Sequence, residues 1–204
     1  MIVLDIETTG LDPEKHAILS IGALDFSNPE NQFYEECYIW EGAECMQATE
    51  TYKAALEVNG FTEEQIQDKS KNSSKQIIEK FSHWIQSCEE HTFAGQNPYF
   101  DLLFIHRTAE REKIPFSLAH RSIDLHALAY THYLKRGLTP PIKNKRTNVN
   151  LDNTLLYVGL PEEPKPHNAL TGAKVCAEAL SRILFAKKLL KDFTQYDIPD
   201  YLKV

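Results

Sequence analysis

Long apolar runs are missing from this 204-residue sequence, and so is any excess of basic side chains. No stretch approaches the roughly 18 consecutive apolar residues of a membrane-spanning helix, so we expect no membrane association. The net charge of −7, from 22 Lys and Arg against 29 Asp and Glu, excludes a globally basic nucleic-acid coat. A local basic groove remains compatible with it.

Cysteine is scarce, and its spacing shows no metal motif. The residues Cys37, Cys45, Cys88 and Cys176 form no C-x-x-C pair, so we expect free thiols and no structural zinc. The N-terminus has no basic segment before a long apolar stretch, so we expect no signal peptide and a cytoplasmic protein. A Gly-rich phosphate loop and a nucleophile elbow are also absent.

The elements that the sequence does contain alternate between strand and helix patterns. Apolar runs predict strands at 2–6, 17–26, 33–40, 92–94 and 122–125, with a turn at 28–31. Helical spacing predicts helices at 52–58, 77–88, 99–112, 125–134, 150–158 and 168–190. Thr62 with Gln65 three positions later forms a capping box, which predicts another short helix there. This order predicts one mixed α/β sheet of about five strands flanked by helices. We expect a single domain over residues 1–190, followed by a C-terminal tail, 191–204.

Two of the predicted helices carry a recognisable inward face, and one long segment carries none. In the helix at 150–158 we expect inward-facing side chains at Leu151, Leu155 and Leu156. In the last helix we expect the alanine-rich face, of which Leu184 is the last residue, to point inward as well. The segment 135–150 holds five basic side chains and no acidic one, and we interpret it as an exposed loop.

Two carboxylates interrupt the first apolar strand. Asp5 and Glu7 are two positions apart, so both point to the same face. Side by side they repel, and each resists ionisation unless a cation neutralises them. One interpretation is a strand end where both are solvated. The other is a site for a hard divalent cation, such as Mg²⁺ or Mn²⁺, which selects carboxylate oxygens.

Asp101 and His167 are further candidates that the residues alone leave open. Asp101 lies in the first turn of a predicted helix, where a negative charge also suits the helix dipole. His167 follows Pro164-Lys165-Pro166 at the start of the last helix, and a lone histidine is more often structural than catalytic.

Three motifs resemble those of one family in order and spacing. The segment Val3-Leu4-Asp5-Ile6-Glu7-Thr8-Thr9-Gly10-Leu11 resembles the first motif of the DnaQ-like (DEDDh) 3′–5′ exonucleases, which include proofreading exonucleases, RNase T and oligoribonuclease. Residues 97–101 resemble their second motif and residues 167–170 the start of their third. The resemblance covers about residues 1–186 and implies a ribonuclease-H-like sheet.

The resemblance also implies an activity and a set of roles. Asp5, Glu7 and Asp101 would hold two metal ions, Mg²⁺ or Mn²⁺, and His167 would take the proton of the attacking water. Thr8 and Leu11 would contact the terminal nucleotide of single-stranded DNA or RNA at its 3′ end. The basic side chains within 135–146 would neutralise phosphates, although a solvated surface explains them equally well.

One position departs from the family pattern. The third motif normally has an aspartate five residues after the histidine, and here that position is Gly172. The absence of this aspartate should weaken the binding of one metal ion, and Gly172→Asp should restore that binding. Among nearby carboxylates, Glu162 and Glu163 lie in the approach to His167 and Glu178 is turned away around the helix, so spacing favours none as a substitute. The alternative function is a degenerate exonuclease fold that binds nucleic acid or protein.

Overall fold

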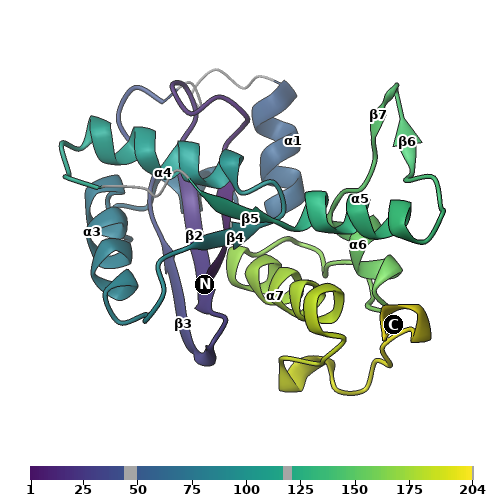
Figure 1. Cartoon of the computed structure of the whole chain (residues 1–204). Coiled ribbons are helices and arrows are strands. Elements are labelled where there is room, and N and C mark those ends of the chain that lie inside the picture. The colour runs from purple at the N-terminus through teal and green to yellow at the C-terminus, as the bar shows by residue number, and fades with distance from the viewer. Residues whose placement is uncertain (44–49, 117–120, 204) are drawn as a thin grey trace.

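The computed structural model describes residues 1–43, 50–116 and 121–203 (Figure 1). Within these ranges Cys37, Cys88 and Cys176 are free thiols, as predicted, and all three are buried. Cys45 lies outside the described residues. None of the helices in the described ranges combines the length and apolarity needed to cross a membrane.

A five-stranded mixed sheet forms the centre of the molecule, with the strand order β3-β2-β1-β4-β5. The strands are β1 (Ile2–Thr8), β2 (Ile18–Asp25), β3 (Asn28–Glu36), β4 (Phe93–Gly95) and β5 (Ser122–Asp124). The first three are antiparallel neighbours, whereas β4 runs parallel to both β1 and β5. The predicted mixed sheet flanked by helices is therefore confirmed, and β1 is its central strand.

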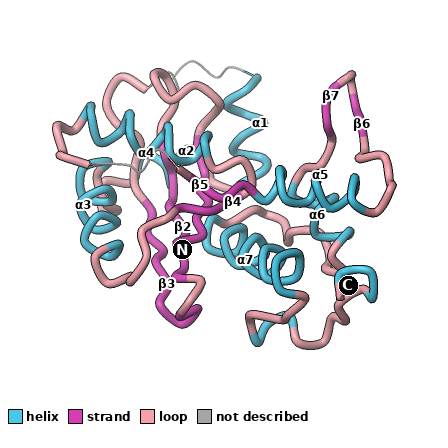
Figure 2. The backbone as a smooth tube through the Cα atoms, viewed as in Figure 1, coloured by secondary structure: helices cyan, strands magenta, loops and turns pink. Residues whose placement is uncertain are grey.

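Helices cover both faces of the sheet (Figure 2). Those that precede β5 in the chain are α1 (Glu50–Asn59), α2 (Glu63–Gln67), α3 (Ser74–Ile85) and α4 (Tyr99–Arg111). The later ones are α5 (Leu125–Lys135), α6 (Leu151–Tyr157) and α7 (Ala169–Phe185). α3 and α4 pack on one face of the sheet, and α7 packs along β1 and β2 on the other.

The side chains of β1 alternate between the two faces of the sheet, and each face has its own apolar core cluster. Ile2, Leu4 and Ile6 belong to the cluster that includes α3 and α4. Val3 belongs to the cluster that includes α7. Because side chains alternate along a strand, Asp5 and Glu7 follow Val3 onto the α7 face.

Two connections differ from the sequence prediction. The hairpin between β2 and β3 turns at residues 26–27, because β3 already begins at Asn28, and the predicted turn at 28–31 is therefore wrong. Within the segment predicted as a loop, β6 (Ile142–Lys143) and β7 (Arg146–Thr147) pair as a small hairpin. Asn144 and Lys145 both adopt positive φ at its turn, a conformation that a tight two-residue hairpin requires.

Two leucines predicted to face inward are exposed. Leu156 on α6 is 53% exposed, whereas Leu155 beside it is fully buried. Leu184 lies in the last turn of α7, which ends at Phe185 where Ala186 adopts left-handed φ and ψ. The predicted helix to residue 190 is therefore too long, because apolar periodicity does not reveal a left-handed cap at an alanine.

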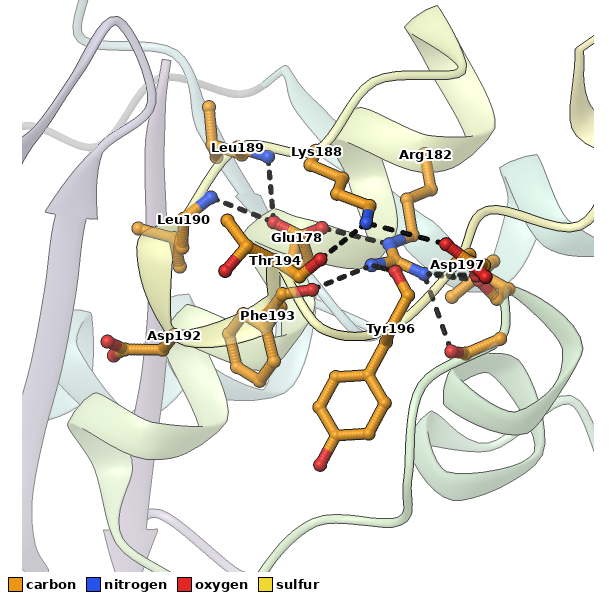
Figure 3. Close-up of polar contacts among 12 residues, drawn as sticks. Glu178, Arg182, Lys188, Leu189, Leu190, Asp192, Phe193, Thr194, Tyr196 and Asp197 are labelled. Carbon is orange, nitrogen blue, oxygen red and sulfur yellow. Dashed lines mark hydrogen bonds and ion pairs between the residues drawn. The ribbon is translucent and has the colours of Figure 1, made fainter.

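A buried ion pair fixes the C-terminal segment to α7 (Figure 3). Arg182 and Glu178 are fully buried, and the guanidinium Nε donates to Glu178 Oε1 over 2.8 Å. Arg182 also donates to the carbonyls of Tyr196 and Asp197. Glu178 accepts from the backbone amides of Leu189 and Leu190, which follow the end of α7. These bonds hold residues 189–197 against the domain and commit Glu178 to a structural role.

Candidate active site

The Asp5 side chain lies where α7 crosses β1. Asp5 pairs in register with Gly22 on β2, and a Cβ atom at Gly22 would collide with backbone atoms of Ala169 and Leu170. Glycine at position 22 therefore lets the first turn of α7 lie directly on the sheet. That close approach brings the helix against the Asp5 side chain, with Glu7 one pleat further along the same face.

Asp101 reaches the same strand from the opposite layer. It lies in the first turn of α4, which begins soon after β4 ends. Its Oδ1 accepts a hydrogen bond from the backbone amide of Ile6 over 3.1 Å, and its side chain is 4% exposed. The amide of Ile6 is available because β4 pairs only with the start of β1. Asp101 is thus anchored between the two positions that carry Asp5 and Glu7.

His167 stands beside the N-terminus of α7. Its backbone amide donates to the carbonyl of Val58 over 3.0 Å, which ties it to the end of α1. Its side chain is 27% exposed, and Nδ1 lies 3.8 Å from Oε2 of Glu163. Asn168 then caps α7 by accepting from two backbone amides. The cap fixes where the helix begins and hence where the imidazole leaves the backbone.

Burial and mutual charge raise the pKa values of the carboxylates in this region. Desolvation raises the pKa of Glu7 to about 8, with a further contribution from Glu163. Burial likewise raises the pKa of Asp101 to about 8, and the charge of Glu7 adds to it. Desolvation and the charges of Asp101, Glu7 and Glu163 hold the pKa of Asp5 well above its usual range. Such mutual shifts mean that these acidic groups share one low-dielectric site.

Glu163 is the residue that spacing did not single out. It is 7% exposed, and its Oε1 is a buried atom with no hydrogen-bond partner among the described residues. A Cβ atom built on Gly172 would lie 3.2 Å from that oxygen and 2.9 Å from Cγ of Asp5. Of the other carboxylates considered, Glu162 is exposed and Glu178 is bound to Arg182. The signal that could have found Glu163 is its place four residues before His167, in a short connection leading to α7.

Thr8 and Leu11 line an apolar cleft next to Glu7. The cleft has a volume of about 360 Å³ and is closed on its other side by α1, with Ala54, Ala55 and Val58. Leu11 is 74% exposed at its mouth. The carbonyl of Thr8 accepts from Nδ2 of Asn59, which joins the end of β1 to the end of α1. The cleft is apolar where it meets α1 and acidic where it meets β1.

In the basic segment, one arginine contacts two tyrosines and three further basic residues lie on a hairpin. The guanidinium of Arg136 lies 3.7 Å from the ring centroid of Tyr201 and donates to Oη of Tyr157. Lys143, Lys145 and Arg146 project from the β6–β7 hairpin and are exposed. The hairpin stands clear of the sheet beside α5 and α6 (Figure 1).

The donor chemistry of the site fits a hard divalent cation. Its side-chain ligands are carboxylate oxygens, and one of them, Oε1 of Glu163, is buried without a partner. In residues 1–43, 50–116 and 121–203, no three acidic, histidine or cysteine side chains already stand in the arrangement of a formed metal site. The fit of this site to a divalent cation therefore rests on the carboxylate chemistry of its side chains, on their burial and on their like charges.

Comparison with protein families identifies one match across most of the chain. The profile of the family described as Exonuclease (RNase T) matches residues 2–180. The matched range contains Asp5, Glu7, Asp101 and His167, and it ends within α7.

Solved structures show the same fold. The nuclease domain of 3′hExo, a DEDDh family member bound to rAMP, superposes with a TM-score of 0.68 at 16% identity, covering 93% of this chain and 94% of that one. Escherichia coli exonuclease I in complex with a dT13 oligonucleotide gives a TM-score of 0.65 at 16% identity, over 89% of this chain and 40% of that one. These similarities confirm the predicted ribonuclease-H-like α/β fold.

Curated relatives are similar over parts of their length. DNA polymerase III PolC-type of Streptococcus pneumoniae is 23% identical over 96% of this chain, which spans only 13% of that polymerase. The 3′–5′ DNA exonuclease Cap18 of Escherichia coli is 33% identical over 51% of this chain and 54% of its own length. The chain thus corresponds to a small segment of the polymerases, and half of the chain matches about half of Cap18.

Proposed function

This chain belongs to the exonuclease family, and from that premise we propose that it is a metal-dependent 3′–5′ exonuclease of single-stranded nucleic acid. The observation that carries the proposal is the set of acidic groups gathered at the crossing of β1 and α7, whose pKa values are raised by burial and by one another's charge. A buried cluster of like charges is unfavourable for a fold, and a divalent cation removes that penalty.

Asp5, Glu7 and Asp101 would hold the cations, Mg²⁺ or Mn²⁺. When bound, two such ions would activate the attacking water and stabilise the charge on the phosphate. Gly172 leaves α7 without the usual fifth acidic side chain, so we expect one of the two ions to be held more weakly than the other. The hydrolysis adds water across the P–O3′ bond and releases a nucleoside 5′-monophosphate.

His167 would act as the general base. Desolvation lowers the pKa of its imidazole, so the neutral form predominates at neutral pH and can accept a proton. Nδ1 faces Glu163, which leaves Nε2 to take the proton of the attacking water. This geometry is compatible with the role that the family resemblance assigns to His167.

The cleft beside Glu7 would hold the terminal nucleotide. Leu11 at its mouth and Val58 on α1 offer an apolar surface to a base without reading its identity. Two solved relatives support a nucleic-acid 3′ end as the partner. Exonuclease I is described in complex with a dT13 oligonucleotide, and a 3′-exonuclease with 3′-end specific recognition of a histone mRNA stem-loop. We therefore propose 3′ ends of single-stranded DNA or RNA as substrates.

A direct assay tests the proposal. The purified chain is incubated with 5′-labelled single-stranded DNA and RNA, with Mg²⁺, with Mn²⁺ and with EDTA. We expect metal-dependent ladders that shorten from the 3′ end, and loss of both ladders in Asp5→Asn. Binding without hydrolysis under every metal condition would instead support the alternative, a degenerate exonuclease fold that acts as a binding module. The observation in favour of that alternative is Gly172.

A further inference from the structure

Gly172 and the Glu163 carboxylate meet beside Asp5, at the position where the family pattern places an aspartate side chain. Gly172 is buried in the first turns of α7, with its Cα facing the Asp5 carboxylate. The space that a side chain at position 172 would fill is already taken by Asp5 from β1 and by Oε1 of Glu163. A carboxylate oxygen is therefore present beside Asp5, although its residue is not on α7.

Glu163 is held there by contacts that leave one oxygen uncommitted. Its backbone amide donates to Oδ1 of Asp152 on α6 over 3.2 Å, which fixes the chain where it passes the site. Its Oε2 lies 3.8 Å from Nδ1 of His167, whereas Oε1 is buried and has no hydrogen-bond partner within the described residues. A buried carboxylate oxygen without a donor is costly unless a ligand completes it.

We propose that Glu163 is a metal ligand of this site and supplies, from the connection before α7, the carboxylate that Gly172 lacks. The inference rests on the proposed function, because it concerns the same metal site. It assigns the uncommitted Oε1 to the cation shared with Asp5. Glycine at position 172 is then a requirement, since any larger residue would displace Asp5 or Glu163.

Metal binding in the absence of substrate tests the inference. Isothermal titration with Mn²⁺ is carried out on the full chain and on Glu163→Gln, with Glu162→Gln as the matched control because Glu162 is the exposed neighbour. We expect Glu163→Gln to weaken Mn²⁺ binding by about tenfold or more, as loss of one charged ligand should, and Glu162→Gln to leave it unchanged. Asp5→Asn serves as the positive control for loss of binding.

The outcomes separate this inference from the proposed function. If Asp5→Asn loses Mn²⁺ and Glu163→Gln keeps full affinity, Glu163 is no ligand and the exonuclease proposal stands. If the unmodified chain binds no Mn²⁺ and hydrolyses nothing, the proposed function fails and this inference fails with it. Unfolding of Glu163→Gln in EDTA would also overturn the inference, because removal of one carboxylate from a cluster of like charges should not destabilise the metal-free protein.

Discussion

Gly172 on α7 lies directly against the carboxylate of Asp5 on β1, so that a Cβ atom at position 172 would stand 2.9 Å from Cγ of Asp5. This contact is made possible by a second glycine, Gly22, whose lack of a side chain lets the start of α7 lie on the sheet. The two glycines together set how closely helix and strand approach at the candidate metal site.

Asp5→Asn and Asp101→Asn should each abolish metal-dependent hydrolysis without unfolding the protein. Both residues lie among groups that repel one another when no cation is bound, so removal of one charge relieves repulsion. The checks are the ladder assay and a thermal melt in EDTA. Full hydrolysis by purified Asp5→Asn would contradict the site assignment.

The metal-free protein should lose stability as the pH rises from about 5 to about 8.5. The folded-state pKa values of Glu7, at about 8, and Glu163, at about 7, lie above the ordinary value of 4.5. The folded state therefore binds these protons more tightly than the unfolded state does. Their contribution is complete below the unfolded pKa and is lost as the pH passes through the folded values.

Thermal melts in EDTA across this range check the sign, with Glu7→Gln as the comparison. At pH 8 we expect Glu7→Gln to melt higher than the unmodified chain, by about 2–4 °C for each kcal/mol of relieved repulsion. Added Mg²⁺ or Mn²⁺ should raise the melting temperature of the unmodified chain more than that of the variant. A melting temperature that rises with pH in EDTA would disprove the interpretation of the cluster.

His167→Ala should reduce turnover by about 10²–10⁴-fold, the usual contribution of a general base. Binding of a single-stranded oligonucleotide, measured with Ca²⁺ in place of the active metal, should be unchanged. Because desolvation lowers the pKa of His167 from 6.5, the acidic limb of the rate profile should lie below that value and disappear in the variant. Collapse of binding with normal turnover per bound complex would make His167 a binding residue.

Leu11→Ala should raise KM and leave kcat nearly unchanged. Leu11 is 74% exposed, so its truncation costs the fold little, and its apolar surface would be buried only by a bound nucleotide. A loss of one to two kcal/mol corresponds to a rise of about 5–30-fold in KM. Leu184→Ala, an exposed leucine at the far end of α7, is the control and should change neither constant.

The sheet and the helices on its faces were predictable because their signals are local. Apolar alternation and capping boxes such as that of Thr62 and Gln65 act within a few residues, and the structure confirms that box. The end of α7 was not predictable, since Ala186 adopts a left-handed conformation that alanine disfavours. The same holds for the β2–β3 turn, which lies in Phe26 and Ser27 instead of the polar residues that follow.

The motif residues of the site could be predicted, but the part played by Glu163 could not. Asp5 and Glu7 share a face through strand alternation, which sequence spacing reveals directly. Glu163 reaches Asp5 only through the packing of α7 on Gly22 and the hydrogen bond from its amide to Asp152. The place of Glu163 four residues before His167 makes it a candidate, but its approach to Asp5 depends on contacts between separate elements, which no local pattern records.

For substitutions of Gly172, the family motif and the packing around this residue predict opposite changes in metal affinity. From the family pattern alone, Gly172→Asp should restore a missing ligand and raise metal affinity. The structure reverses that expectation, because the space beside Gly172 is filled by Asp5 and by Oε1 of Glu163, which is 3.2 Å from a built Cβ. Gly172→Ala adds only the Cβ atom, and we expect it already to weaken Mn²⁺ binding by displacing the Asp5 carboxylate.

Gly172→Asp should therefore raise Mn²⁺ affinity only when Glu163 is removed. In the Glu163→Ala background the Asp5 carboxylate can rotate into the space that Glu163 leaves, and an aspartate at position 172 restores the charge of the site. The two substitutions should then be strongly non-additive, each lowering affinity alone and the pair lowering it less than their sum. Gly172→Asn in the same background has similar size without charge and should give no recovery. A rise in Mn²⁺ affinity for Gly172→Asp with Glu163 intact would show that the two carboxylates do not compete for one place, and Glu163 would lose its role as the replacement ligand.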